Sequence, residues 1–344
     1  MSKNKFLITG GCGFIGTATI NRLINNKENE VLNIDKLTYA ANIASLKELK
    51  LQENFKFVKL NISKFKGLQK VVSSFKPNII IHLAAETHVD RSIAKPKEFI
   101  ESNIIGTFNL LETSRKYYNH LNKKEKKNFL FLHVSTDEVF GDSENKLKPS
   151  KELDAYDPSS PYSATKASSN HLVKVWNKTF GLPIIITNCS NNYGPRQFNE
   201  KFIPSVIINA LSGKKIRIYG NGRQSRDWIY VEDHVNALFK VLEKGKIGEI
   251  YNIGTQHKVE NIKVAEMICE ILNNFVKIKP KGIQNFNELI TFVNDRPAHD
   301  IKYDLNTDKI YKKLSWEPTI SFEEGLFKTV KWYMRNRDWW TKFK

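Results

Sequence analysis

A tyrosine and a lysine stand four residues apart at Tyr162 and Lys166, directly after a Ser-Ser-Pro segment. The serines can cap a helix, and Pro161 suits its first position. This spacing then places the phenol and the ammonium on one face of the helix. The ammonium, the positive helix end and a cationic cofactor ring would each favour phenolate, so the pair could remove a proton from a hydroxyl group. The structural alternative is a surface Tyr and Lys on an ordinary helix.

A second group of reactive residues, Thr136, Asp137 and Glu138, follows the apolar run 129–134. Neighbouring side chains of a strand point to opposite faces, so both carboxylates can serve one site only if the strand ends before them. Gly141 is consistent with a turn there. Two close carboxylates in a partly desolvated cleft resist ionising together, which lets one act as acid and the other as base. A solvated acidic turn is the structural alternative.

The third feature is a set of glycines, Gly10, Gly13 and Gly16, between an apolar run and a stretch that can be helical. They would let the backbone turn sharply, approach a pyrophosphate and pack a helix against its strand. Asp35 closes the next apolar run; it can accept from both ribose hydroxyls and would repel a 2′-phosphate. Glycines also occur in turns that bind nothing. Strand, helix and acid together predict an NAD site.

Apolar runs alternate with helix-compatible stretches through the first half of the chain. This pattern predicts an α/β fold with a doubly wound parallel Rossmann sheet. The expected strands are 6–9, 31–34, 55–60, 79–83, 129–135 and 184–188. After about residue 190 the pattern changes to loops rich in Asn, Gly and Pro, with a strand at 215–219 and helices at 263–273 and 323–335. We assign the NAD-binding domain to 1–189 plus 227–254, and a smaller C-terminal α/β substrate-binding domain to 190–226 plus 255–344.

The 344-residue chain carries a formal net charge of +18. Clustered basic residues bind nucleic acid, but apart from 123–127 the lysines are scattered, so we expect no nucleic-acid function. Apolar runs fall short of the about 20 residues of a membrane span, and the N-terminus lacks a signal-peptide core. We therefore expect a cytoplasmic protein without a membrane partner. The three cysteines lack metal-site spacing, so no metal is expected.

These motifs resemble the extended short-chain dehydrogenase/reductase superfamily, the NAD-dependent epimerases and dehydratases, and specifically its nucleotide-sugar 4,6-dehydratases of the dTDP-glucose type. The resemblance covers nearly the whole chain and includes the stretches 83–92, 188–195, 226–234 and 295–300. The Thr-Asp-Glu triplet distinguishes these dehydratases from related epimerases and decarboxylases, which lack this acid and base pair. The resemblance implies a hydro-lyase that oxidises C4 of the sugar, eliminates water across C5 and C6, and returns hydride to C6.

The resemblance also implies a role for each catalytic residue. Tyr162 would deprotonate the 4-hydroxyl, with Lys166 and Thr136 adjusting its proton affinity. Glu138 would then remove the C5 proton, and Asp137 would protonate the departing 6-hydroxyl. NAD would end the cycle in the form in which it began.

Two binding sets follow from the same resemblance. The implied cofactor set is Gly10, Gly13, Phe14, Ile15, Gly16, Asp35, Lys36, Asn61, Ile62, Leu83, Ala84, Ala85, Asn103, Tyr162 and Lys166. The implied substrate set is His88, Asn191, Glu200, Lys201, Arg226, Asn261, Arg296 and His299. His88 and its neighbour Asp90 could instead brace the site, and a salt bridge of Arg226 with Asp227 competes with ligand binding. Asn61 stands where an Asp commonly contacts adenine, although its carbonyl oxygen can still accept, and Phe140 stands where the motif usually has Tyr.

Alternatives remain for the substrate and for the class of protein. We expect dTDP-glucose, while UDP-glucose or another nucleotide sugar would undergo the same chemistry. A 4-epimerase would have no use for Asp137 and Glu138, and a non-catalytic dinucleotide sensor should lack part of the catalytic set. The family further implies a homodimer in which helices at about 103–118 and 162–180 pack against their copies.

Overall fold

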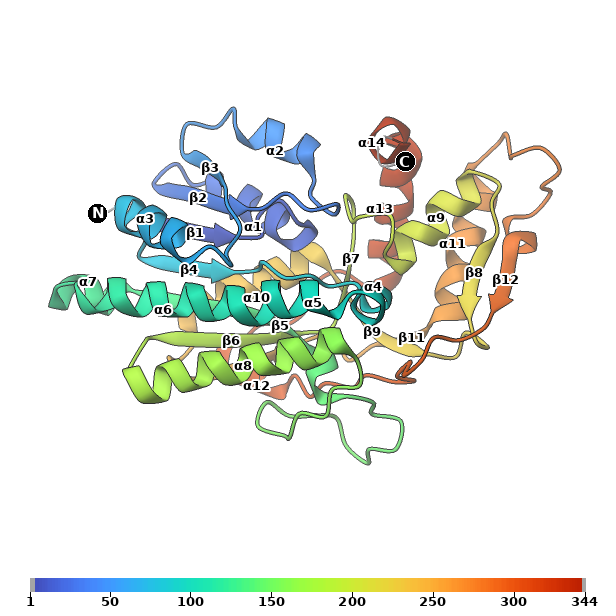
Figure 1. Ribbon diagram of the computed structural model, residues 1–344. Helices are drawn as coiled ribbons and strands as arrows, with labels where there is room; N and C mark the ends of the chain where they lie inside the picture. Colours follow the sequence, from blue (N-terminus) through green and yellow to red (C-terminus); the bar gives the residue numbers. More distant parts are fainter. Residues whose placement is uncertain (1–3, 342–344) are drawn as a thin grey trace.

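A seven-stranded sheet forms the centre of the N-terminal half in the computed structural model, which describes residues 4–341 (Figure 1). The strand order is β10-β6-β5-β4-β1-β2-β3, and neighbouring strands are parallel. The predicted doubly wound Rossmann class is confirmed, and the predicted strands agree with the observed ones within two residues at each end. The strands are β1 (Asn4–Thr9), β2 (Asn29–Asp35), β3 (Phe55–Lys59), β4 (Ile79–His82), β5 (Leu130–Thr136), β6 (Ile184–Cys189) and β10 (Ile250–Ile253).

Helices cover both faces of this sheet, which explains why its strands are continuously apolar. Leu7 and Ile8 are adjacent on β1 and point to opposite faces, so each is buried in a different cluster. Ile8 packs in the cluster that contains residues of α1 (Phe14–Ile24), α2 (Ile43–Leu49), α10 (Val231–Lys244) and α12 (Asp308–Leu314). Leu7 packs in the cluster under α3 (Phe65–Phe75), α6 (Gly106–Asn119) and α8 (Pro161–Phe180).

A run of helical segments leads from β4 toward α6. It consists of α4 (Val89–Ala94), α5 (Pro96–Phe99) and a π-helical turn, η1 (Ile100–Ile105), which continues directly into α6. After α6 follows α7 (Lys123–Asn128), whose surface is exposed and rich in lysine. π-Helical turns frequently occur at functional sites, because they redirect side chains within a helix.

The C-terminal half builds two small sheets and a core of its own beside the large sheet (Figure 1). Tyr193, Trp228 and Tyr333 lie in this core. The predicted strand near 215–219 and the helices near 263–273 and 323–335 are present. One sheet contains β7 (Asn191–Tyr193), β9 (Ser225–Tyr230) and β11 (Lys258–Glu260), the other β8 (Ile216–Tyr219) and β12 (Ile290–Val293), and the helices are α9 (Phe202–Leu211), α11 (Asn261–Phe275), α13 (Phe322–Arg335) and α14 (Arg337–Thr341).

The chain crosses between the two halves more than once. β10 belongs to the large sheet, whereas β9 pairs with β7 and β11 although most of it falls in the segment 227–254 that we assigned to the NAD-binding domain. The domain boundaries therefore stay a prediction. Within residues 4–341, helices that combine the length and the apolar character needed to span a bilayer are absent.

Candidate active site

A cleft opens at the carboxyl ends of the large sheet, where the strand order reverses between β1 and β4. Its walls come from both halves of the chain, because α9 and the loop before it face the strand ends. Nineteen of the predicted site residues line it: Gly10, Gly13, Phe14, Ile15, Gly16, Asp35, Lys36, Ile62, Leu83, Ala84, Ala85, Thr136, Asp137, Glu138, Tyr162, Lys166, Asn191, Glu200 and Lys201. Seven others lie outside this lining: Asn61, His88, Asn103, Arg226, Asn261, Arg296 and His299.

The glycine loop between β1 and α1 has the shape that a dinucleotide requires. Gly10 has a φ of +74°, and a Cβ there would lie 2.6 Å from the backbone of Ala84. A Cβ on Gly16 would lie 2.4 Å from the carbonyl oxygen of Gly10. Within the described residues, Gly13 precedes α1 at the N-cap position and supplies no side-chain cap, so the first N–H groups of the helix remain available to a pyrophosphate.

Asp35 ends β2 beside this loop. One carboxylate oxygen accepts from the backbone N–H of Cys12 at 3.0 Å and the other from that of Leu37 at 2.8 Å. These bonds fix the carboxylate while leaving lone pairs for ribose hydroxyls. Burial raises the pKa of Asp35, and the two backbone bonds oppose that rise. Together with the glycine loop, this arrangement fits NAD.

The π-helical turn braces the next part of the wall. Asn103 is buried, and its side chain accepts from the backbone N–H of Glu86 at 2.8 Å and donates to the hydroxyl of Thr165 at 2.9 Å. Its neighbour Ser102 accepts from the ammonium of Lys36 at 2.7 Å, and Lys36 also pairs with Glu86 at 2.8 Å. Asn103 therefore holds Glu86, which lines the cleft, instead of lining it itself. Asn61, by contrast, accepts from a backbone N–H in its own turn.

The Thr-Asp-Glu triplet meets the condition for a shared site, which is that the strand ends before the two acidic residues. β5 ends at Thr136, and η2 (Asp137–Phe140) begins immediately, so both carboxylates line the cleft. The Thr136 hydroxyl donates to Asp137 at 3.1 Å and accepts from the backbone N–H of Glu138 at 3.3 Å. Gly141 closes the turn with a φ of +69°, where a Cβ would collide with the carbonyl oxygen of Asp157.

The surroundings of the two carboxyl groups differ. Burial and the neighbouring charge of Glu138 raise the pKa of Asp137 well above its usual value. Burial also raises the pKa of Glu138, but the positive charges of Arg296, Arg226 and Lys201 counteract this rise. The environment therefore favours Asp137 as the protonated acid and Glu138 as the carboxylate base.

Helix α8 carries Tyr162 and Lys166 into the same cleft. Ser160 caps it in a reciprocal capping box with Ser163, and Pro161 occupies its first turn, as the sequence predicts. The Lys166 ammonium donates to the carbonyl oxygen of Val134 at 2.8 Å, and burial lowers its pKa to about 8.

The proton affinity of Tyr162 differs from what the sequence suggested. Burial and the charge of Glu138 raise the pKa of the Tyr162 phenol well above its usual value, while a hydrogen bond with Thr136 lowers it. Lys166 is bonded to a carbonyl oxygen and not to the phenol. The protein's own residues thus hold the phenol neutral, and a base role needs the positive charge that an oxidised nicotinamide supplies when bound.

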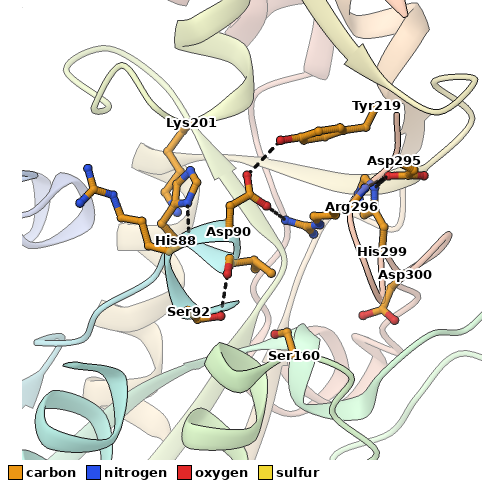
Figure 2. A network of polar contacts seen from close by, with 12 residues as sticks. His88, Asp90, Ser92, Ser160, Lys201, Tyr219, Asp295, Arg296, His299 and Asp300 are labelled. Carbon is orange, nitrogen blue, oxygen red and sulfur yellow. Dashed lines mark hydrogen bonds and ion pairs between the residues drawn. The ribbon is translucent and has the colours of Figure 1, made fainter. Parts of the chain in front are cut away.

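Figure 2 shows Lys201, which lines the cleft, together with His88, Arg296 and His299, which lie outside its lining. Lys201 donates to the carbonyl oxygen of Thr87 at 2.9 Å, and Glu200 pairs with Arg91 at 3.2 Å. His88 caps α4 by accepting from the backbone N–H of Arg91 at 3.3 Å, and it therefore braces this loop. Arg296 pairs with Asp90, His299 pairs with Asp295, and Asn261 begins α11.

Arg226 has a largely structural environment. Its guanidinium donates to the carbonyl oxygens of Asp300 at 2.7 Å and Ile301 at 3.1 Å, and lies 4.4 Å from the centre of the Tyr303 ring. The expected competing partner, Asp227, instead accepts from Thr255 and Gln256. Arg226 is buried, and its charge reaches Glu138 only as a field across the cleft wall.

Several cleft residues were missed by the reasoning from sequence. Cys189 is the last residue of β6 and Ser190 follows it, so their position at a parallel strand end was a usable signal. The cleft residues that lie in loops carried no such signal in the sequence, because only folding brings them to the cleft. The lining residues not predicted include Thr38, Glu86, Thr87, Ser102, Cys189, Ser190, Asn192, Gln197, Phe198, Phe202 and Trp228.

Comparisons with known proteins cover nearly the whole chain. The family model described as GDP-mannose 4,6 dehydratase matches residues 7–329. A curated dTDP-glucose 4,6-dehydratase of Escherichia coli is 50% identical over 346 residues, which cover 98% of this chain and 96% of that protein. DesIV, a dTDP-glucose 4,6-dehydratase from Streptomyces venezuelae crystallised with NAD, has a TM-score of 0.89 at 35% identity, covering 99% of this chain and 100% of that one. A dTDP-glucose 4,6-dehydratase of Bacillus anthracis in complex with NAD has a TM-score of 0.86 at 37% identity, covering 99% and 100%.

Proposed function

The chain belongs to the family described as GDP-mannose 4,6-dehydratase, and from this membership and its cleft we propose that it converts dTDP-glucose to dTDP-4-keto-6-deoxyglucose and water with NAD. One observation carries the proposal: Tyr162, Asp137 and Glu138 line a single cavity with the glycine loop. A 4-epimerase needs no second acid and base there. The enzyme is accordingly a hydro-lyase, a lyase that removes water.

The chemistry divides among the residues of the cleft. When bound, NAD accepts a hydride from C4 and later returns it to C6. Tyr162 receives the proton of the 4-hydroxyl, while Lys166 adds positive charge on the same helix face. The 4-ketone then acidifies the hydrogen on C5.

The elimination is the step for which the carboxyl pair is needed. Glu138 removes the C5 proton, because nearby positive charges favour its carboxylate form. Asp137 gives its proton to the departing 6-hydroxyl, which leaves as water, because burial keeps this acid protonated. The proton held by Glu138 can return to C5 once C6 has received the hydride. Tyr162 then carries one proton more than at the start and Asp137 one fewer, and proton exchange with solvent restores both.

The proposal is tested with purified protein and dTDP-glucose. We expect a 4-keto sugar, detected by its absorbance in alkali. UDP-glucose in a parallel reaction measures the preference for the nucleobase. If every nucleotide sugar tried remains unchanged while NAD stays bound, a dinucleotide sensor is the better account.

Two further expectations stay proposals. For a homodimer, Ile105 and Phe108 on the η1–α6 run and Val175 and Phe180 on α8 are large apolar side chains at 40 to 48% exposure, within the two ranges predicted to pair. Light scattering of the parent and of Phe108→Glu checks this, since a buried glutamate should shift a dimer toward monomer. The cytoplasmic location expected from the sequence also stays a proposal.

A further inference from the structure

Asp90 links two segments of the C-terminal half that are far apart in sequence (Figure 2). One carboxylate oxygen accepts from Nη1 of Arg296 at 3.3 Å. The other accepts from the hydroxyl of Tyr219, at the end of β8, at 3.2 Å. A single side chain on α4 therefore fixes the ends of two side chains that approach from across the cleft.

Residues close to Asp90 in the sequence also make polar contacts with the chain segment that precedes α9. Arg91 pairs with Glu200 at 3.2 Å and lies 3.5 Å from the centre of the Tyr39 ring. The carbonyl oxygen of Thr87 accepts from Lys201 at 2.9 Å. The segment around α4 is thus one of the places where side chains of the C-terminal half contact the N-terminal half.

Of the two partners of Asp90, Arg296 has more hydrogen-bond donors available to a ligand. Its side chain is 18% exposed, and its Nε is buried without a hydrogen-bond partner among residues 4–341. A buried N–H of this kind is costly unless an acceptor reaches it. The charge of Arg296 also acts on Glu138 and Lys201, which places it at the edge of the reaction cleft. An arginine held by one nitrogen can still offer its other donors to a diphosphate.

We infer that Asp90 is a positioning residue that holds Arg296 and Tyr219 in the orientation that receives the diphosphate part of the nucleotide sugar. The inference rests on the proposed function. Asp90, Arg296 and Tyr219 all lie outside the cleft lining. Because the carboxylate of Asp90 would itself repel a diphosphate, its contribution to binding passes through its two partners. Arg296 and Tyr219 would otherwise sample several rotamers, and substrate binding would have to order them.

Two effects of Asp90 oppose each other, and their balance gives the direction of the test. Its negative charge weakens the attraction of Arg296 for a diphosphate, which would lower affinity. Its two bonds preorganise both partners, which raises affinity. Because 38% of the Asp90 side chain is exposed, solvent screens the charge effect. We therefore expect preorganisation to dominate.

The experiment compares steady-state kinetics of the NAD-containing parent with Asp90→Asn and Asp90→Glu. For Asp90→Asn we expect the KM for dTDP-glucose to rise about tenfold, because misplaced binding groups cost affinity, with kcat within about twofold of the parent. Inhibition by dTDP should weaken in parallel. Asp90→Glu keeps the charge and both acceptors, so its KM should lie closer to that of the parent.

Asp308→Asn is the matched control. It removes the same charge from an exposed pair with Lys312 on α12, and its KM should equal that of the parent. Melting temperature and NAD content identify any variant that is misfolded. If Asp90→Asn is misfolded, Tyr219→Phe serves instead, since it removes one of the two bonds without changing charge, and it should raise KM.

Three results would overturn the inference. An unchanged KM in a folded Asp90→Asn variant means that the two bonds do not matter for binding. A lowered KM means that Asp90 merely competes with the diphosphate for Arg296. A fall in kcat alone assigns Asp90 to the chemical step. All three require an active parent, whereas failure of the proposed function appears as an inactive parent.

Discussion

Replacing Lys166 by methionine should stabilise the NAD-free protein while abolishing turnover. Burial lowers the pKa of the Lys166 ammonium from 10.5 to about 8. This pKa difference of about 2.5, at about 1.36 kcal/mol each, means that burying the charged form costs about 3.4 kcal/mol. Methionine avoids that cost but loses the bond to the Val134 carbonyl oxygen, worth about 1 kcal/mol. The net gain at about pH 7 is about 2 kcal/mol.

The sign of the pH dependence follows from the same values. The folded-state pKa lies below the unfolded one, so between about pH 8 and pH 10.5 the unfolded chain binds more protons and the stability of the parent rises with pH. At about pH 9 the remaining cost is about 2 kcal/mol, so the advantage of Lys166→Met shrinks to about 1 kcal/mol. Cys189 interacts electrostatically with Lys166, but burial raises its pKa to about 12, so its thiol stays neutral in both folded proteins at these pH values and its contribution cancels in the difference.

Urea unfolding of the NAD-free proteins at these two pH values measures both quantities. Lys178→Met, on an exposed position of the same helix, is the control and should change the free energy of unfolding little. A Lys166→Met variant that is no more stable than the parent at the lower pH, or whose advantage grows as the pH rises, would show that burying the Lys166 ammonium does not carry this cost.

Three further changes test other parts of the structure. Tyr162→Phe removes the proposed base for the 4-hydroxyl and should leave no NADH signal after dTDP-glucose is added; normal NADH formation would exclude this role. Gly10→Ala places a Cβ 2.6 Å from the backbone of Ala84 at a φ of +74°, so the purified protein should lose most of its NAD, measured as released nucleotide; full retention would contradict the proposed cradle. Asp233→Ala leaves the backbone N–H and hydroxyl of Thr319 without their buried acceptor, so urea unfolding should report a loss of about 3 kcal/mol, and an unchanged midpoint would show that this link adds nothing.

Local patterns predicted the elements that carry the chemistry. The strand before Gly10, the acid at Asp35 and the cap before Tyr162 each depend on a few neighbouring residues, and the structure has these elements where the sequence places them. The end of β5 at Thr136 could also be inferred, because Asp137 and Glu138 could share a site only beyond a strand end. Such features need only local backbone preferences.

Side-chain contacts between segments that are distant in sequence could not be predicted in this way. The family resemblance implies Arg226 as a substrate ligand, and this role stays a prediction; its contacts with the carbonyl oxygens of Asp300 and Ile301 could not be inferred from the sequence. The cofactor role implied for Asn103 likewise stays a prediction, and its hydrogen bonds with the backbone of Glu86 could not be inferred from the sequence. These contacts join segments that are distant in sequence, so spacing within a motif carries no information about them.

Glu138 is proposed to remove the C5 proton after C4 has been oxidised. The most direct measurement is a single-turnover absorbance trace of NAD-loaded Glu138→Gln after dTDP-glucose is added. We expect NADH to form and persist in stoichiometric amount, because oxidation proceeds while the amide cannot take the proton that must leave before water is eliminated. Parent-like turnover, with NADH rising and decaying at the parent rate and 4-keto-6-deoxy product released, would contradict it.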